Sequence, residues 1–309
     1  MKMRWSIRGV LIFVVLSSCS HLGAETFRVA TYNVENYLDA PTESRSHVKS
    51  PAARAKVRES LRALRPDVVA LQEVGGESAL RELQTSLKTD GLDLPYSELV
   101  HGYDTNIHVA VLSRFPITAR RPHTTESFLL SGRRIHVSRG FAEVDIRVNA
   151  RCSFTLLNAH LKSRRPVAVA DEAEERLEEA KVLRGIIDAD LAANPDANLI
   201  VLGDFNDAKD SAPLKEILGR GKLRLVDTRP AERNGDAAPS VNPRYEPRRV
   251  AWTAYYGVED SYSRVDYILL SANLAREWLP EETYVLALPD WGVASDHRPL
   301  VATFQADNR

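Results

Sequence analysis

Cysteine is almost absent from this chain: its 309 residues include two, Cys19 and Cys152. Cys19 lies in an amino-terminal segment with the features of a targeting signal, so one cysteine remains in the rest of the chain. A single cysteine excludes an intrachain disulfide there. Cys152 begins an apolar run that ends at Leu157, so we expect a buried structural thiol. An exported chain without disulfides must be stabilised by its core, with a metal ion as a further source of stability.

An excess of charge of either sign is also absent. The formal net charge is -1, so the chain has no overall basic field of the kind that favours nucleic-acid binding. Nucleic-acid binding would therefore depend on local basic clusters. From Glu25 onward there is no linker, low-complexity tract or short-period repeat, and we expect one domain over residues 25–309.

No apolar run is long enough to span a bilayer, which takes about 20 residues. The amino terminus instead has the order of a signal peptide, with basic residues, the apolar run Val10–Leu16 and small residues. Residues 16–19, Leu-Ser-Ser-Cys, resemble the bacterial lipobox, in which Cys19 becomes the lipidated first residue. The alternative is an ordinary signal peptide, cleaved near Ala24. Either way we expect residues 1–24 to direct an extracytoplasmic protein, membrane-anchored or secreted to the periplasm or beyond.

A helix, a buried strand and a carboxylate occur in the same order twice. The elements are helix 50–65, strand 68–71 and Glu73 in the first series, and helix 173–191, strand 199–202 and Asp204 in the second. The recurrence predicts two similar halves that meet at a shared site. Further strands are expected over residues 27–31, 109–112, 141–148, 154–157, 265–270 and 300–304, with long loops over 209–263. Mixed strands with few helices fit a sheet sandwich with helices outside.

Residues that bind metals or move protons stand beside these apolar runs. They are Asn33, Glu73, His160, Asp204, Asn206, Asp266, Asp296 and His297. Strands of an α/β protein bring their ends to one edge, where loops build the site. Carboxylates, histidines and amides gathered there can hold a divalent cation and a phosphate. The pattern therefore predicts a metal-dependent phosphoester hydrolase.

Each motif also has a structural explanation when it is taken alone. The segment from Gly203 to Asn206 is typical of a turn, and Glu73 precedes a helical pattern that favours an acid at its start. A lone histidine such as His160 is more often structural than catalytic. Arg139, which precedes a strand, has the alternative of a solvated surface charge, and Asp266 that of a polar residue on a solvent-facing strand. The conjunction of the motifs, rather than any single one, favours a site.

This ordered set resembles the endonuclease/exonuclease/phosphatase superfamily (deoxyribonuclease-I-like), over Phe27 to about Phe304. The resemblance implies an α/β fold, a four-layer αββα sandwich of two mixed sheets with outer helices, and a site where the sheets open. It also implies Mg²⁺, with Mn²⁺ as an alternative, and one or two metal ions. The implied roles are Asn33, Glu73 and Asp296 at the metal, Asp204 and Asn206 on the attacking water and phosphoryl group, Asp266 paired with His297, and His160 and Arg139 at the phosphate.

The sequence indicates the substrate less clearly than it indicates the class of reaction. Val74-Gly75 stands where apurinic-site endonucleases usually carry Thr-Lys, and residues 263–267 lack the Trp-Cys-Asp-Arg motif of inositol polyphosphate phosphatases. Basic clusters, with aromatic residues beyond the last of them, favour nucleic acid, although solvated loops explain them equally. The clusters are Arg133, Arg134 and Arg139; Lys162, Arg164 and Arg165; and Arg244, Arg248 and Arg249 around Tyr245.

These observations leave three hypotheses. The first is an exported, monomeric, Mg²⁺-dependent nuclease, an endonuclease acting on DNA or RNA by water attack on phosphate. The second is a phosphatase or a sphingomyelinase-like lipid phosphodiesterase on the same scaffold. The third is a non-catalytic surface lipoprotein. The full set of site residues argues against the third hypothesis, because a binding module does not need it.

The lipobox interpretation predicts that processing depends on the Cys19 thiol. In a bacterial host, globomycin should block maturation of the wild-type chain, and Cys19→Ser should accumulate as precursor on an immunoblot. Normal processing of the Cys19→Ser protein would instead establish an ordinary signal peptide cleaved near Ala24.

Overall fold

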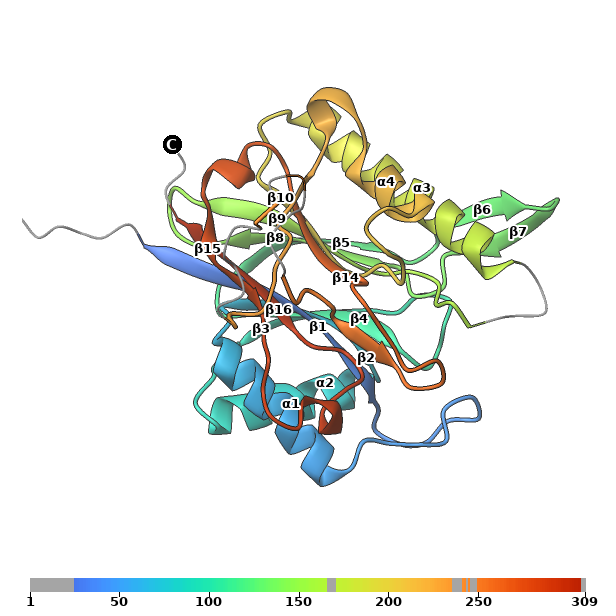
Figure 1. The fold of residues 1–309 in the computed structure, drawn as a ribbon, viewed down its shortest axis with the longest axis vertical. Coiled ribbons are helices and arrows are strands. Elements are labelled where there is room, and N and C mark those ends of the chain that lie inside the picture. Colours follow the sequence, from blue (N-terminus) through green and yellow to red (C-terminus); the bar gives the residue numbers. More distant parts are fainter. Residues whose placement is uncertain (1–24, 166–170, 235–240, 243, 245–248, 307–309) are drawn as a thin grey trace, which may run out of the picture.

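A computed structural model describes residues 25–165, 171–234, 241–242, 244 and 249–306. Two six-stranded mixed sheets form its body (Figure 1). The first contains, in spatial order, β15 (Trp278–Val285), β16 (Leu300–Gln305), β1 (Thr26–Tyr37), β2 (Val68–Val74), β4 (His108–Ser113) and β3 (Tyr96–Val100). The second contains β11 (Val226–Asp227), β14 (Asp266–Leu270), β10 (Leu199–Asp204), β9 (Ser153–His160), β8 (Phe141–Arg147) and β5 (Ile117–His123).

Helices cover the outer face of each sheet (Figure 1). They are α1 (Pro51–Leu64) and α2 (Glu77–Thr89) on the first sheet, and α3 (Glu172–Ala193) and α4 (Ala212–Leu218) on the second. Two hairpins, β6 (Ser127–Leu130) with β7 (Arg133–His136) and β12 (Ala254–Tyr256) with β13 (Ser261–Ser263), lie outside the sheets, and three short 3₁₀ helices are η1 (Gly221–Leu223), η2 (Leu274–Arg276) and η3 (Trp291–Val293).

Three apolar clusters hold the layers together because strand side chains alternate between faces. On β2, Ala70 packs between the sheets, whereas its neighbour Val69 packs beneath α1 and α2. On β10, Leu202 packs between the sheets, whereas Val201 packs beneath α3 and α4. Strands buried on both faces explain the continuous apolar runs of the sequence, and the predicted four-layer αββα sandwich is confirmed.

The predicted helix over 50–65 is confirmed with its capping. Ser50 Oγ accepts a hydrogen bond from Ala53 N at 3.2 Å, and Pro51 occupies the first turn. Arg65 adopts a left-handed conformation that ends the helix before Pro66. The second predicted helix corresponds to α3, whose N-cap is Asp171.

The two sheets share one topology, as the recurrence in the sequence predicted. β1 and β2 are parallel neighbours connected through α1, and β9 and β10 are parallel neighbours connected through α3. Two antiparallel strands flank each parallel pair on either side. The carboxyl ends of both parallel pairs therefore meet, which brings residues after β1, β2, β9 and β10 to one site.

A buried pair of amides joins the two sheets just below that site. Gln72 Nε2 on β2 donates to Asn158 Oδ1 on β9 at 2.8 Å. Asn158 Nδ2 donates to the carbonyls of Leu71 and Ala110 in the first sheet, at 3.0 and 2.9 Å. Thr31 Oγ1 accepts a second bond from Gln72 Nε2 at 3.0 Å. These specific bonds in an apolar interface fix how the sheets lie against each other.

The prediction for Cys152 agrees with the structure, whereas the prediction of long loops over 209–263 agrees only in part. Cys152 is buried and forms no disulfide with the described residues, as predicted. The expectation of long loops over 209–263 is wrong in part, because α4, η1, β11, β12 and β13 lie in that range. Ser211 and the proline at position 213 start α4, a helix signal in a segment too short for periodicity to be visible.

Replacing Asn158 should destabilise the protein. Asn158→Ala removes the bond to Gln72 and two donors to buried carbonyls, so the free energy of unfolding should fall by about 2 kcal/mol. Urea denaturation measures this loss. Thr125→Ala, at an exposed position, should change it by less than about 0.5 kcal/mol, and an equally small change for Asn158→Ala would contradict the bridging role.

Candidate active site

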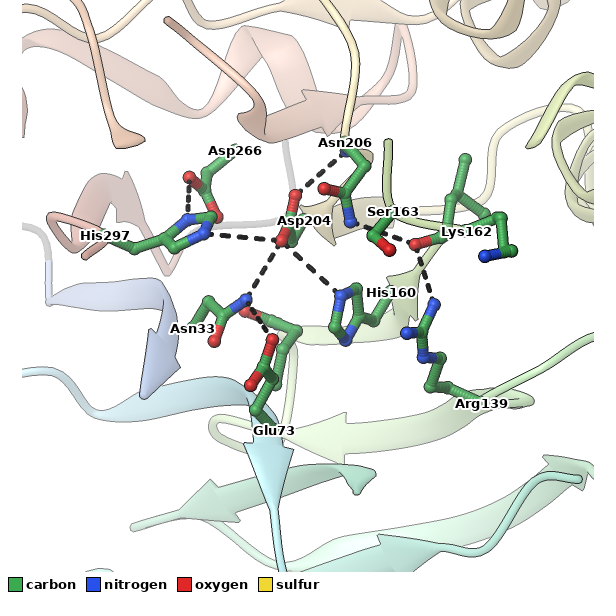
Figure 2. A network of polar contacts seen from close by, with 12 residues as sticks. Asn33, Glu73, Arg139, His160, Lys162, Ser163, Asp204, Asn206, Asp266 and His297 are labelled. Carbon is green, nitrogen blue, oxygen red and sulfur yellow. Dashed lines mark hydrogen bonds and ion pairs between the residues drawn. The ribbon is translucent and has the colours of Figure 1, made fainter. Parts of the chain in front are cut away.

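The carboxyl ends of the two parallel strand pairs bring most of the predicted residues together (Figure 2). Asn33 lies in β1 where its regular pairing with β2 ends, Glu73 is the next-to-last residue of β2, and His160 and Asp204 end β9 and β10. Asp266 begins β14 and lies opposite Asp204 in the antiparallel register. His297 precedes β16; the Ser295 hydroxyl accepts from its backbone N–H at 3.0 Å and donates to the Asn33 carbonyl at 2.8 Å.

Asp204 is the centre of the site and is 1 % exposed. Its Oδ2 accepts from Asn33 Nδ2 at 3.0 Å and lies 3.6 Å from His160 Nε2 and 3.7 Å from His297 Nε2. Its Oδ1 accepts from the Asn206 backbone N–H at 2.9 Å. Burial raises the pKa of Asp204 to about 7, against the lowering effect of His297. A carboxylate with this pKa can accept a proton near neutral pH.

His297 lies between two buried carboxylates. Its Nδ1 is 2.8 Å from Asp266 Oδ2, and its Nε2 faces Asp204. Burial opposes the charged imidazolium, but Asp266 and then Asp204 outweigh it, so the pKa of His297 is well above its usual range. His297 is therefore a charged donor near neutral pH, oriented by Asp266.

His160 is the opposite case, because it is kept neutral. Burial lowers its pKa well below the usual range, and the charges of Arg139, His297 and Arg45 add to this effect. The 3.6 Å separation from Asp204 is too long for a normal hydrogen bond, and its buried Nδ1 has no hydrogen-bond partner in the part of the chain that the structure describes. A neutral ring with free hydrogen-bonding capacity suits contact with a phosphoryl oxygen.

Carboxylates crowd the side of the site formed by β1 and β2. Glu73 accepts from Asn36 N at 3.0 Å and from Asn33 Nδ2 at 3.4 Å. Burial raises the pKa of Glu35, and repulsion from Asp296 and Glu73 raises it further. The Asp296 carboxyl is half exposed, and its pKa is raised by partial burial and then by Glu73. Mutual repulsion among three carboxylates is the situation that a bound divalent cation relieves.

A second group of possible metal ligands is Asp204, Asp266 and His297, whose ligand atoms lie within 4.8 Å of one another. This group differs from the predicted set of Asn33, Glu73 and Asp296. A charged imidazolium has no lone pair to offer a cation, so the second group suits proton transfer better. Asn33 directs its Nδ2 at Asp204 and Glu73, while its Oδ1 accepts from Glu35 N at 3.0 Å. Its predicted role as a metal ligand stays a prediction.

Arg139 and Asn206 converge on one backbone carbonyl. Arg139 Nη1 and Asn206 Nδ2 both donate to Leu161 O, at 3.2 and 3.0 Å (Figure 2). Arg139 is 6 % exposed, so the interpretation of a solvated surface charge is wrong. Its buried Nε lies 3.8 Å from Asp104 Oδ2 and makes no hydrogen bond to any described residue. Asn206 adopts a left-handed backbone with φ 53°, as Glu73 does with φ 63°, a strained conformation found often at functional sites.

Helix α3 fixes these segments through two residues that the sequence analysis missed. Glu179 is fully buried, and its two carboxylate oxygens accept from Ser138 N at 2.9 Å and Lys162 N at 2.6 Å. Arg176 donates to Lys162 O at 3.1 Å and to Asp207 Oδ2 at 2.9 Å. They hold the residues next to Arg139, His160 and Asn206. The sequence signal that could have identified Arg176 and Glu179 is a pair of polar residues three positions apart on the buried face of a helix.

The basic clusters differ from what was expected. Arg133 and Arg134 are exposed on β7, away from the buried Arg139, so the three form no single patch. Lys162 is buried, whereas Arg164 and Arg165 are exposed. Arg248 and Tyr245 lie outside the described residues. Trp252 packs against Tyr262, Trp291 and the Arg298 guanidinium and has a structural role.

The raised pKa of Asp204 makes stability depend on pH. A carboxyl whose pKa is higher in the folded chain than in the unfolded chain costs folding free energy where it is ionised in both states. For Asp204 this cost is complete above pH 7, decreases as the pH falls, and is absent below about pH 4. At 1.36 kcal/mol per pKa unit it is about 4 kcal/mol.

In EDTA at pH 8, Asp204→Asn should therefore be more stable than the wild type, by less than about 4 kcal/mol, because the variant also loses the bond from Asn33 and the attraction between Asp204 and the charged His297. The difference should disappear as the pH approaches 4. Urea denaturation across this range measures it, and a variant that is less stable at pH 8 would refute the buried, ionised carboxylate.

Known proteins share this architecture. The structure matches beta toxin from Staphylococcus aureus with a TM-score of 0.61 and 18% identity, over 89% of this chain and 99% of that one. It matches the human nocturnin catalytic domain with bound sulfate at 0.60 and 17%, over 90% and 94%. It matches the 3′ phosphatase NExo from Neisseria, bound to a product DNA hairpin, at 0.57 and 16%, over 90% and 99%. At these identities the matches establish the fold.

No curated protein sequence matches the chain. The sequence profile of the Endonuclease/Exonuclease/phosphatase family matches residues 30–297, which include every predicted site residue. The resemblance found in the sequence is thereby confirmed, together with its general class of phosphoesterase hydrolases. The chain belongs to the Endonuclease/Exonuclease/phosphatase family.

Proposed function

We propose that this protein is an exported, metal-dependent phosphodiesterase that acts on nucleic acid. The observation that carries the proposal is the buried Asp204 carboxylate, which lies in contact with Asn33 and close to His160 and His297. Three strand ends and one loop from both sheets supply these groups. A binding module gains nothing from ionising a buried carboxylate among them, whereas a hydrolase needs such a base.

In the proposed reaction Asp204 accepts a proton from the attacking water, because its pKa is near neutral. His297, charged and oriented by Asp266 through Nδ1, donates a hydrogen bond from Nε2 to the negative charge that develops on the phosphoryl oxygens. Neutral His160 and the second N–H of Asn206 provide further donors. Arg139, whose Nη1 donates to Leu161 O, adds positive charge next to these groups.

Glu73 and Asp296, with Asn33 beside them, are the residues that would hold Mg²⁺ or Mn²⁺. A divalent cation there supplies charge that offsets the phosphate and stabilises the transition state. Carboxylate oxygens are the ligands that Mg²⁺ prefers, with water and phosphate completing its shell. The crowding of Glu35, Glu73 and Asp296 supports this position.

The position of the amino terminus favours a soluble substrate over a bilayer lipid. If Cys19 carries a lipid, the tether enters the domain at Thr26, where β1 begins. Asn33 lies seven residues along the same strand, about 23 Å away at 3.3 Å per residue. In an anchored protein whose strand β1 begins nearest the membrane, the site would lie at the far end of that strand. The DNA hairpin in the related 3′ phosphatase structure adds support for a nucleic-acid substrate.

Hydrolysis by the purified mature protein tests the proposal. With Mg²⁺ or Mn²⁺ it should cleave plasmid DNA or RNA, and EDTA should abolish the activity. Asp204→Asn should lower kcat by at least about 10³-fold, because the proton acceptor is lost. Asp210→Asn, an exposed change on the following loop, should leave the rate unchanged.

The other substrates discriminate among the hypotheses. Cleavage of sphingomyelin alone would favour the lipid phosphodiesterase, and cleavage of only a terminal phosphate would favour the phosphatase. Turnover of DNA should decrease as salt increases, since backbone charges contribute to binding, whereas turnover of bis-p-nitrophenyl phosphate should change little. Failure to cleave any of these substrates with either metal would refute the proposal.

A further inference from the structure

Arg45 lies beside the proposed metal carboxylate, although no motif indicated it. It belongs to the segment between β1 and α1, blue in Figure 1. Its Nη1 lies 3.5 Å from Glu73 Oε2 and donates a hydrogen bond to Asn36 Oδ1. Its charge also contributes to lowering the pKa of His160. Arg45 therefore acts on both the metal side and the phosphate side of the site.

The backbone that carries Arg45 is held in place. Thr42 and Arg45 exchange two backbone hydrogen bonds, at 2.9 and 3.2 Å. Further along, the buried Lys49 donates to Ala294 O at 2.6 Å and lies 3.5 Å from Glu35 Oε2. This attaches the segment to the residues before Asp296. A fixed backbone and a long side chain allow the guanidinium to change partners while the segment stays in place.

The ion pair of Arg45 with Glu73 is of the weak kind. The two side chains are 22% and 17% exposed, and pairs at partly exposed positions contribute about 0–1 kcal/mol. Within the described residues, Nε and Nη2 of Arg45 make no hydrogen bond. A divalent cation at Glu73 competes directly with this single positive charge, and the guanidinium keeps two nitrogens for another anion.

We propose that Arg45 exchanges partners during the reaction cycle. It pairs with Glu73 when no metal is bound, and it binds the substrate phosphate when a cation occupies Glu73. The proposal rests on the proposed function and assigns a further catalytic residue to that site. An arginine fits both roles, because its planar fork binds carboxylate and phosphate with paired hydrogen bonds.

The exchange predicts opposite effects of Arg45→Ala on two measurements. Mg²⁺ should bind about two- to fivefold more tightly, because the competing charge is gone; calorimetry on the mature protein without substrate measures this. At saturating Mg²⁺, kcat/KM for bis-p-nitrophenyl phosphate should fall about 10- to 100-fold, the effect of one charged hydrogen-bonding contact. Inorganic phosphate should also bind more weakly to the Mg²⁺-loaded variant.

Two further variants serve as controls. Arg62→Ala, an exposed arginine on α1, should change none of the three values. Arg45→Lys keeps the charge but not the fork, so Mg²⁺ affinity should stay near that of the wild type while kcat/KM falls. Unchanged or weaker Mg²⁺ binding by Arg45→Ala would overturn the pairing with Glu73, and unchanged phosphate binding would overturn the substrate contact.

The metal and phosphate titrations do not depend on turnover. If the wild type hydrolyses nothing, the proposed function fails, and the two titrations still decide whether Arg45 exchanges anions. Thermal unfolding of each variant shows whether it is folded. A folded Arg45→Ala protein with both expected binding changes supports the proposal, and a folded one without them refutes it.

Discussion

The relative position of the two sheets is the constraint on which this structure depends. Apolar packing between them is strong but sets position only loosely, because a hydrophobic contact has no direction. The bond from Gln72 to Asn158, with the bonds from Asn158 to two carbonyls of the first sheet, supplies direction. Glu73 follows Gln72 directly, and His160 lies two residues after Asn158. The same buried amides thus set the distance between the metal side and the phosphate side of the site.

Burying charged groups at the candidate active site, where the two sheets meet, costs folding free energy. Other parts of the fold must offset that cost. Asp204 is disfavoured as an ion by burial, and His297 stays charged only because Asp266 and Asp204 lie against it. Apolar burial in the three clusters provides the stabilising free energy that offsets this cost. Helix α3 adds a buried carboxylate, Glu179, in the same way. The site proposed to do the chemistry is therefore one where buried charge costs folding free energy.

The sequence predicted those parts of the fold whose signals are local. Periodicity and capping were sufficient for α1 and α3, and continuous apolar runs were sufficient for β2 and β10. The residues that follow those runs, such as Glu73 and Asp204, could be placed at one edge by topology alone. Arg139 could not, because its burial depends on Glu179 and Asp104, which are distant in sequence. The Arg133 and Arg134 neighbours suggested an exposed patch that tertiary packing divides.

Local sequence patterns do not identify the site residues that lie in loops. Arg45 follows no apolar run and has no periodic partner, and it reaches Glu73 from a segment that Lys49 attaches to Ala294, two residues before Asp296. Such a side chain costs little stability to change, since its ion pair is weak, and it can alter metal and substrate binding together. A family that keeps its strand-end residues can thus vary its chemistry through the loops, where a substitution disturbs neither sheet nor helix. For this protein, the proposed role of Arg45 adds a substrate contact from the segment 38–50 to the buried residues that predict the reaction.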